Sequence, residues 1–219
     1  MTSGVPTLER LRARPEQGPP VAPPAGRDGG GGGGGGGGRP GAAPLSTTIT
    51  GVWLLVGAAA ILFAAFTSTL LVRRAEADWQ VGPMPPVLWA TTALLLGSSA
   101  TLEWTRRLAR LGRGSAARWG LAATLGLGVV FLAGQWAAWR QMAASGLHMA
   151  SGAHSAFFYL LTGTHGLHVA GGIAALGWAL WKVRWTVPGR AVAAVAPAAV
   201  YWHFVDVLWL YVWLVLFWT

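Results

Sequence analysis

Two pairs of ionisable residues lie inside long apolar stretches of the sequence. His165 and His168 occur in the segment THGLH, and His203 and Asp206 occur in WHFVD. The members of each pair are three residues apart, so they share one face of a helix. Ionisable groups are costly inside a bilayer and are often functional there. Imidazoles at such positions could bind a metal or a haem, carry protons, or hold neighbouring helices together.

The composition predicts an integral membrane protein. Of the 219 residues, 53% are hydrophobic and 11% are charged, and 14 are tryptophans, which favour the membrane–water interface. Apolar runs longer than about 18 residues indicate transmembrane helices rather than a water-soluble core. The sequence contains no cysteine. Disulfides, thiolate metal sites and cysteine nucleophiles are therefore excluded.

Five apolar segments carry these pairs, and they predict an all-α bundle of five transmembrane helices. Each has about 20 residues or more, enough to cross a hydrocarbon core of about 30 Å. The predicted spans are residues 50–72, 86–105, 119–141, 155–181 and 192–218. Residues 1–48 are predicted to form a disordered tail, because prolines and the unbroken glycine run at 29–38 offer nothing to bury. The membrane domain is therefore expected at residues 49–219.

Lysine and arginine are distributed unevenly between the two sides of the predicted membrane domain. Of the 16 basic residues, only Arg73, Arg74 and Arg140 fall on the side opposite the N-terminal tail. The positive-inside rule then predicts a cytoplasmic N-terminus and an external C-terminus. This topology accounts for the net charge of +9, so no nucleic-acid partner is expected. Glu103 lies three residues before Arg106, a spacing that predicts an ion pair near the cytoplasmic end of the second span.

The four intramembrane residues are predicted to form one polar cluster between the fourth and fifth spans. Because these spans run in opposite directions, HGLH and HFVD both fall near the middle of the bilayer. Asp206 could then accept a hydrogen bond from an imidazole of the fourth span. Small residues permit the close approach of membrane helices. Those expected to do so here are Gly163, Gly166, Ala170 and Ala174.

A bound metal or haem is the alternative for these histidines. His165 and His168 differ by only about 4.5 Å in rise, which is too little for two haems stacked through a bundle. One haem between the fourth span and His203 remains open, and would make the chain a small haem b electron carrier with two histidine ligands. A copper or zinc site is disfavoured, because a dry midplane pocket lacks the open water position of a catalytic metal. No nucleophile beside a base and no acid pair is recognisable, so no catalytic residues, bound cofactor or metal are predicted for this chain.

Two segments carry a resemblance to a known family. FFYLLTGTHGLHVAGG (157–172) and YWHFVDVLWLYVWLVLF (201–217) resemble the signature segments of subunit III of haem–copper terminal oxidases, the cytochrome c oxidase family. Weaker matches follow in the family's order, and the resemblance covers residues 50–218. These weaker matches are GVWLLVGAAAILF (51–63), LWATTALLLGSSATLEW (88–104) and FLAGQWAAW (131–139).

The resemblance implies a non-catalytic subunit of a respiratory oxidase that reduces oxygen and pumps protons. Such a subunit packs beside subunit I, in a complex that also holds subunit II, and the haems and copper are in these partners. It binds phospholipid and supports stability and proton uptake in the bacterial plasma membrane. Five spans are similar to the short bacterial form, which lacks the first two helices of longer relatives. Arg106, Arg107 and Lys182 are the expected contacts for lipid head groups.

Two positions depart from the family pattern. Intramembrane glutamates of the family align with Ala59 and Ala138 here. Proton-related roles of those carboxylates therefore do not transfer to this chain. The same departures leave open a divergent branch, such as a subunit III-like partner of a nitric oxide reductase.

Overall fold

The computed structural model describes residues 45–76, 79, 84–184 and 188–218, and within these ranges it contains five α-helices and no β-strand. The helices are α1 (Leu45–Arg74), α2 (Val87–Arg110), α3 (Gly114–Ala144), α4 (Ala153–Arg184) and α5 (Pro188–Trp218). The all-α prediction is confirmed, and each predicted span coincides with one helix. Residues 1–44 of the predicted tail lie outside the described residues. α1 already begins at Leu45, before the predicted end of the tail at residue 48.

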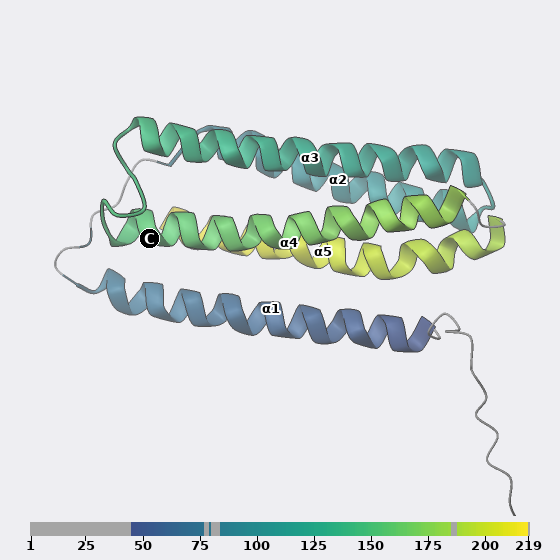
Figure 1. Cartoon of the computed structure of the whole chain (residues 1–219), viewed down its shortest axis with the longest axis horizontal. Coiled ribbons are helices and arrows are strands. Elements are labelled where there is room, and N and C mark those ends of the chain that lie inside the picture. The colour runs from purple at the N-terminus through teal and green to yellow at the C-terminus, as the bar shows by residue number, and fades with distance from the viewer. Residues whose placement is uncertain (1–44, 77–78, 80–83, 185–187, 219) are drawn as a thin grey trace, which may run out of the picture. The chain divides into compact units, whose positions relative to one another are not determined.

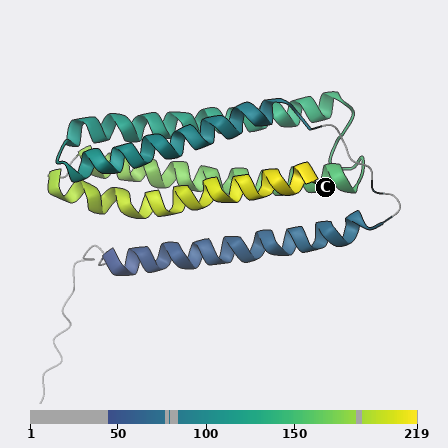
Figure 2. The same cartoon turned by 180° about the vertical axis from the view of Figure 1, so that it is seen from behind.

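Helices α2 to α5 form a four-helix bundle (Figure 1). α2 packs mainly against α3 and α5, and α4 packs against the same two helices. α1 packs against α4 and α5, on the side of the bundle away from α2 and α3 (Figure 2). Successive helices run in opposite directions, so short connections suffice to join them.

The buried residues of the bundle follow a coiled-coil spacing. On α3 they recur in alternating steps of four and three, and on α2 in alternating steps of three and four. This period keeps one face of each helix turned toward its neighbours, as in left-handed helix packing. The α3 positions are Ala117, Leu121, Thr124, Gly128, Phe131, Gln135, Ala138 and Met142. Polar residues share this buried face with apolar ones.

Trp202 of α5 reaches the three other helices of the bundle at one level. Its indole is fully buried, and its Nε1–H donates to Ser98 Oγ of α2 at 2.9 Å. The same ring lies against Gly128 of α3 and Gly172 of α4. A Cβ atom at either glycine would lie only 2.5 Å or 2.9 Å from the ring, respectively. Glycine is therefore required at both positions for the indole to fit.

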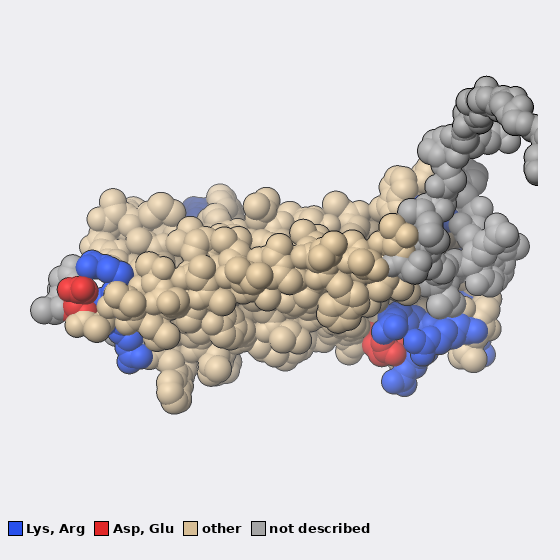
Figure 3. Space-filling view, turned by 90° about the horizontal axis from the view of Figure 1, so that it is seen from below, with Lys and Arg blue, Asp and Glu red and all other residues tan. Residues whose placement is uncertain are grey.

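Three of the helices are long and apolar enough to cross a membrane within the described residues. They comprise Thr47–Arg74, Gly114–Ala144 and Val195–Trp218, which belong to α1, α3 and α5. α2 and α4 do not reach the same apolarity, because α2 carries Glu103 and three arginines in its second half and α4 carries three histidines. Figure 3 shows one face of the molecule, on which lysine and arginine gather at the two ends and leave an uncharged band between them. The chain is thus a helical membrane protein.

Replacing Gly128 by alanine is expected to lower the free energy of unfolding by about 1–3 kcal/mol, because the new methyl group overlaps Trp202. Gly126→Ala is the matched control on the same helix. No heavy atom lies within 4 Å of its Cβ position, and alanine is favoured over glycine in a helix by about 1 kcal/mol. Unfolding in mixed micelles with increasing SDS, followed by circular dichroism, measures both variants. Equal stability of the two would contradict this close contact.

Candidate functional site

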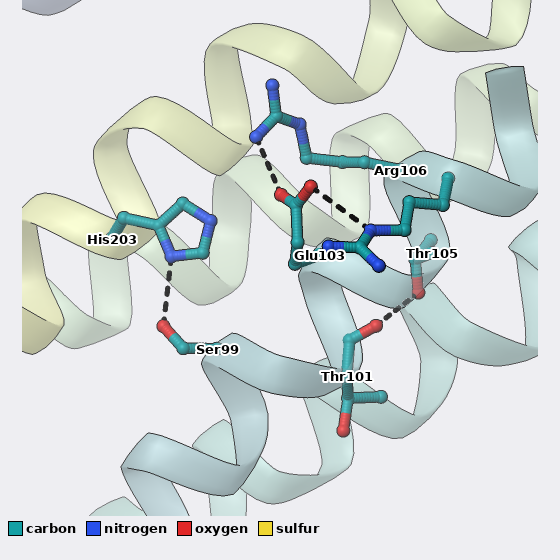
Figure 4. Close-up of polar contacts among 7 residues, drawn as sticks. Ser99, Thr101, Glu103, Thr105, Arg106 and His203 are labelled. Carbon is teal, nitrogen blue, oxygen red and sulfur yellow. Dashed lines mark hydrogen bonds and ion pairs between the residues drawn. The ribbon is translucent and has the colours of Figure 1, made fainter.

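The intramembrane carboxylate and one intramembrane imidazole meet at a serine of α2. Ser99 Oγ donates a hydrogen bond to Asp206 Oδ2 and lies 2.9 Å from His203 Nδ1 (Figure 4 shows the His203 contact). A serine hydroxyl has one proton and two acceptor sites. Since that proton goes to Asp206, the hydroxyl accepts from His203 Nδ1–H, which fixes the imidazole tautomer. Asp206 is only 4% exposed, whereas His203 is half-buried.

Two indoles of α5 extend this contact along α2. Trp202 Nε1–H donates to Ser98, and Trp209 Nε1–H donates to Thr92 Oγ1, also at 2.9 Å. We call this set the α2–α5 polar seam. It comprises Thr92, Ser98 and Ser99 on α2 and Trp202, His203, Asp206 and Trp209 on α5.

The hydroxyl residues of the seam were not identified from the sequence, although a signal is present. Thr92 and Ser98, which accept from the two indoles, are six residues apart on α2, and Trp202 and Trp209 are seven apart on α5. Similar spacing on two antiparallel helices brings donors and acceptors to nearly matching levels. Hydrogen bonds between membrane helices contribute about 0.6–2 kcal/mol each. The seam therefore stabilises the α2–α5 contact.

The ion pair predicted near the end of the second span is confirmed. Arg106 Nη1 lies 2.8 Å from Glu103 Oε2, and Arg107 Nε lies 3.8 Å from Glu103 Oε1 (Figure 4). These side chains are partly exposed, so the pairs add little to stability. Arg106 and Arg107, which were expected to bind lipid phosphate, thus both lie beside the Glu103 carboxylate. The third, Lys182, has its ammonium 5.3 Å from the ring centre of Trp178.

The two histidines of α4 lie outside the seam, which differs from the predicted single cluster. His165 is fully buried, with its ring 5.8 Å from Phe131 of α3 and 4.9 Å from Trp209 of α5. Neither of its ring nitrogens forms a hydrogen bond with the described protein. His168 Nδ1–H donates to the Thr164 carbonyl of its own helix at 2.8 Å. The expected hydrogen bond from α4 to Asp206 is therefore replaced by the one from Ser99.

His168 lies near α1 instead, with its ring 5.7 Å from the ring of Phe63. α4 does pack against α5, as predicted, but through aromatic rings and a glycine. Tyr201 OH of α5 also donates to the His168 carbonyl at 3.2 Å. A spacing of three residues correctly predicted a shared contact for His203 and Asp206, which both meet Ser99. It did not do so for the two histidines of α4, which face different helices.

The small residues of α4 divide among different neighbours. Gly163 and Gly166 face Trp139 and Leu132 of α3 rather than α5. Ala170 and Ala174, which were expected in the same contact, are exposed in this chain. Gly172, which was not singled out, makes the close approach to α5.

The positions that align with family glutamates are buried and apolar. Ala59 of α1 is 3% exposed and Ala138 of α3 is fully buried. No group of three or more His, Cys, Asp or Glu side chains among the described residues could hold a metal ion. The polar groups that α5 carries at mid-span are arranged to join helices.

Comparisons with known proteins agree with this architecture. A family model described as "Cytochrome c oxidase subunit III" matches residues 50–219. The "Probable cytochrome c oxidase subunit 3" of Nocardia farcinica is 34% identical over 179 residues, which cover 78% of this chain and 85% of the relative. That of Mycobacterium tuberculosis strain H37Rv is 32% identical over 168 residues, covering 74% and 81%. The "Cytochrome c oxidase subunit 3" of Synechocystis is 29% identical over 167 residues, covering 73% and 70%. Because the family-model match covers most of the chain and includes both signature segments, the chain belongs to the cytochrome c oxidase subunit III family.

Proposed function

We propose that this subunit III is a non-catalytic, structural part of a haem–copper oxidase. The observation that carries the proposal is that Ser99 of α2 engages both His203 and Asp206 of α5. The imidazole and carboxylate that could have served a redox centre are thereby used to join two helices. The haems and copper of the oxidase are assigned to its partner subunits I and II. A haem between α4 and α5 is not favoured, because His165 and His203 lie in separate contacts.

All five helices are proposed to cross the bacterial plasma membrane. α2 is the shortest, and its 24 residues extend about 36 Å at about 1.5 Å per residue, enough for a core of about 30 Å. Its less apolar composition is compatible with a span, because its hydroxyl groups bond to α5 or to its own backbone carbonyls. α4 likewise lies among α1, α3 and α5.

The N-terminus is proposed to be cytoplasmic and the C-terminus external. One end of the bundle is formed by the end of α2, the start of α3 and the end of α4 (Figure 1). The basic residues at that end whose side chains the structure describes are Arg106, Arg107, Arg110, Arg113, Arg118, Lys182 and Arg184. Those at the other end are Arg73, Arg74 and Arg140. The positive-inside rule assigns the first end to the cytoplasm.

Subunit I is proposed to pack beside this chain, with phospholipid filling the remaining contacts. His203 and Ser99 are only partly buried although they lie near the middle of their helices. Acyl chains offer no hydrogen bonds, so polar groups at this depth favour contact with another protein. The ammonium of Lys182, placed over Trp178 near the proposed cytoplasmic end, supports an interfacial contact with a lipid phosphate.

Asp206→Leu is expected to raise severalfold the rate at which the oxidase inactivates during turnover, because it removes the acceptor that joins α5 to Ser99. Asp206→Asn is the matched control, since its amide oxygen can still accept from the hydroxyl. A tag on this chain is used to purify each complex, and oxygen consumption is followed over time. Wild-type inactivation kinetics and lipid content in Asp206→Leu would refute the structural role. If the tagged wild-type chain did not co-purify with subunits I and II, the subunit assignment itself would fail.

Orientation can be tested by single-cysteine labelling, because the natural chain has no cysteine. Leu111 follows α2 and Met149 lies between α3 and α4, and both side chains are well exposed. A membrane-impermeant maleimide added to intact spheroplasts should label Met149→Cys at once. Leu111→Cys should react only after the membrane is permeabilised. The reverse pattern would mean that the proposed orientation is inverted.

A further inference from the structure

Gln135 of α3 and His165 of α4 are two buried polar side chains whose nitrogen and oxygen atoms all lack a hydrogen bond within the described protein. Gln135 is 3% exposed and His165 is 0% exposed. Buried polar groups in native proteins are nearly always hydrogen-bonded, so each exception calls for a partner. By contrast, most buried serine and threonine hydroxyls of the bundle donate to a backbone carbonyl of their own helix. These are Thr91, Ser98, Thr105, Thr124 and Thr162.

The two side chains lie at the same level of the α3–α4 contact. Phe131, one turn before Gln135, has its ring 5.8 Å from that of His165. Trp139, one turn after Gln135, donates from Nε1 to Thr162 Oγ1, and Thr162 is one turn before His165. Phe131 and Gln135 lie on the buried face of α3, and Trp139, one turn further along, is partly buried. The antiparallel register therefore brings Gln135 opposite His165.

The surroundings are apolar on most sides, and two glycines flank the imidazole. Trp209 lies 4.9 Å from the His165 ring and 5.0 Å from that of Phe131, which closes the side toward α5. Gly163 and Gly166 flank His165 along α4. Added Cβ atoms there would lie 3.5 Å from Trp139 and 3.8 Å from Leu132. Gly163 and Gly166, which lie beside the imidazole, thus face α3 and have no side chain of their own.

We propose that Gln135 and His165 together bind buried water in the α3–α4 contact. The amide offers a carbonyl acceptor and an NH₂ donor, and a neutral imidazole offers one donor and one acceptor. A direct bond between the two side chains would pair one atom of each and leave the other two unpaired. A small molecule that both donates and accepts completes the set, and water is the smallest molecule of that chemistry.

Such water would connect α3 to α4 as Ser99 connects α2 to α5. Buried water typically makes about three hydrogen bonds and becomes part of the structure. A water bound by both side chains would fix the register of the two helices, because sliding one past the other breaks its bonds. The site lies inside one subunit, so it does not depend on how this chain meets its partners.

Cryo-electron microscopy of the intact oxidase, at a resolution that resolves ordered water, tests the proposal directly. The expected result is a density peak within about 3.2 Å of the Gln135 amide and of a His165 ring nitrogen. Clear density for both side chains with no peak between them would overturn the proposal. So would a direct Gln135–His165 bond with no water at the remaining polar atoms.

A double-mutant cycle gives a second measurement with an independent readout. Gln135→Leu and His165→Phe each remove one side of the site, and each should lower the thermal midpoint of the purified oxidase subunit. The double variant, which removes both polar groups, should lose less than the sum of the two single losses. Gln141→Leu on the exposed face of α3 is the control and should leave the midpoint unchanged. Strictly additive losses would overturn the coupling.

Discussion

A single indole sets the packing of the four-helix bundle. Trp202 of α5 bonds to Ser98 of α2 and lies directly against Gly128 of α3 and Gly172 of α4. An indole is among the largest side chains that a helix can bury, and it fits here because both facing positions lack a Cβ atom. Its apolar body and its one donor are both satisfied, so the three neighbours are held at one level. The remaining contacts of α5 are arranged above and below it.

The membrane imposes the second constraint, which is that polar groups within the helices need partners inside the protein. α5 meets this requirement with α2, whose hydroxyls accept from two indoles and engage the His203–Asp206 pair. α2 consequently carries Thr92, Ser98 and Ser99 on the face that meets α5. We propose that, in a subunit of an oxidase, such internal contacts maintain the surface that meets the other subunits.

The sequence was sufficient to predict the five helices and the Glu103–Arg106 pair, because apolar length and a spacing of three residues are local properties. It also pointed to His203 and Asp206 as neighbours on one helix face. It did not reveal that this face meets α2. Both α2 and α4 run antiparallel to α5 and pack against it, so either helix could have been the partner. Ala170 and Ala174 illustrate the same limit. A stripe of small residues predicts that another helix approaches closely, but it does not say which helix or at which residue. The assembled bundle shows that Gly172 is the position that meets α5.

The carboxylate of Asp206 is held by Ser99 of α2 and not by an imidazole of α4. Two double-mutant cycles measure the coupling free energies, one combining Asp206→Leu with Ser99→Ala and the other combining it with His168→Phe. We expect a coupling of about 0.6–2 kcal/mol for Asp206 with Ser99 and none beyond error for Asp206 with His168. A coupling confined to the His168 cycle would contradict it.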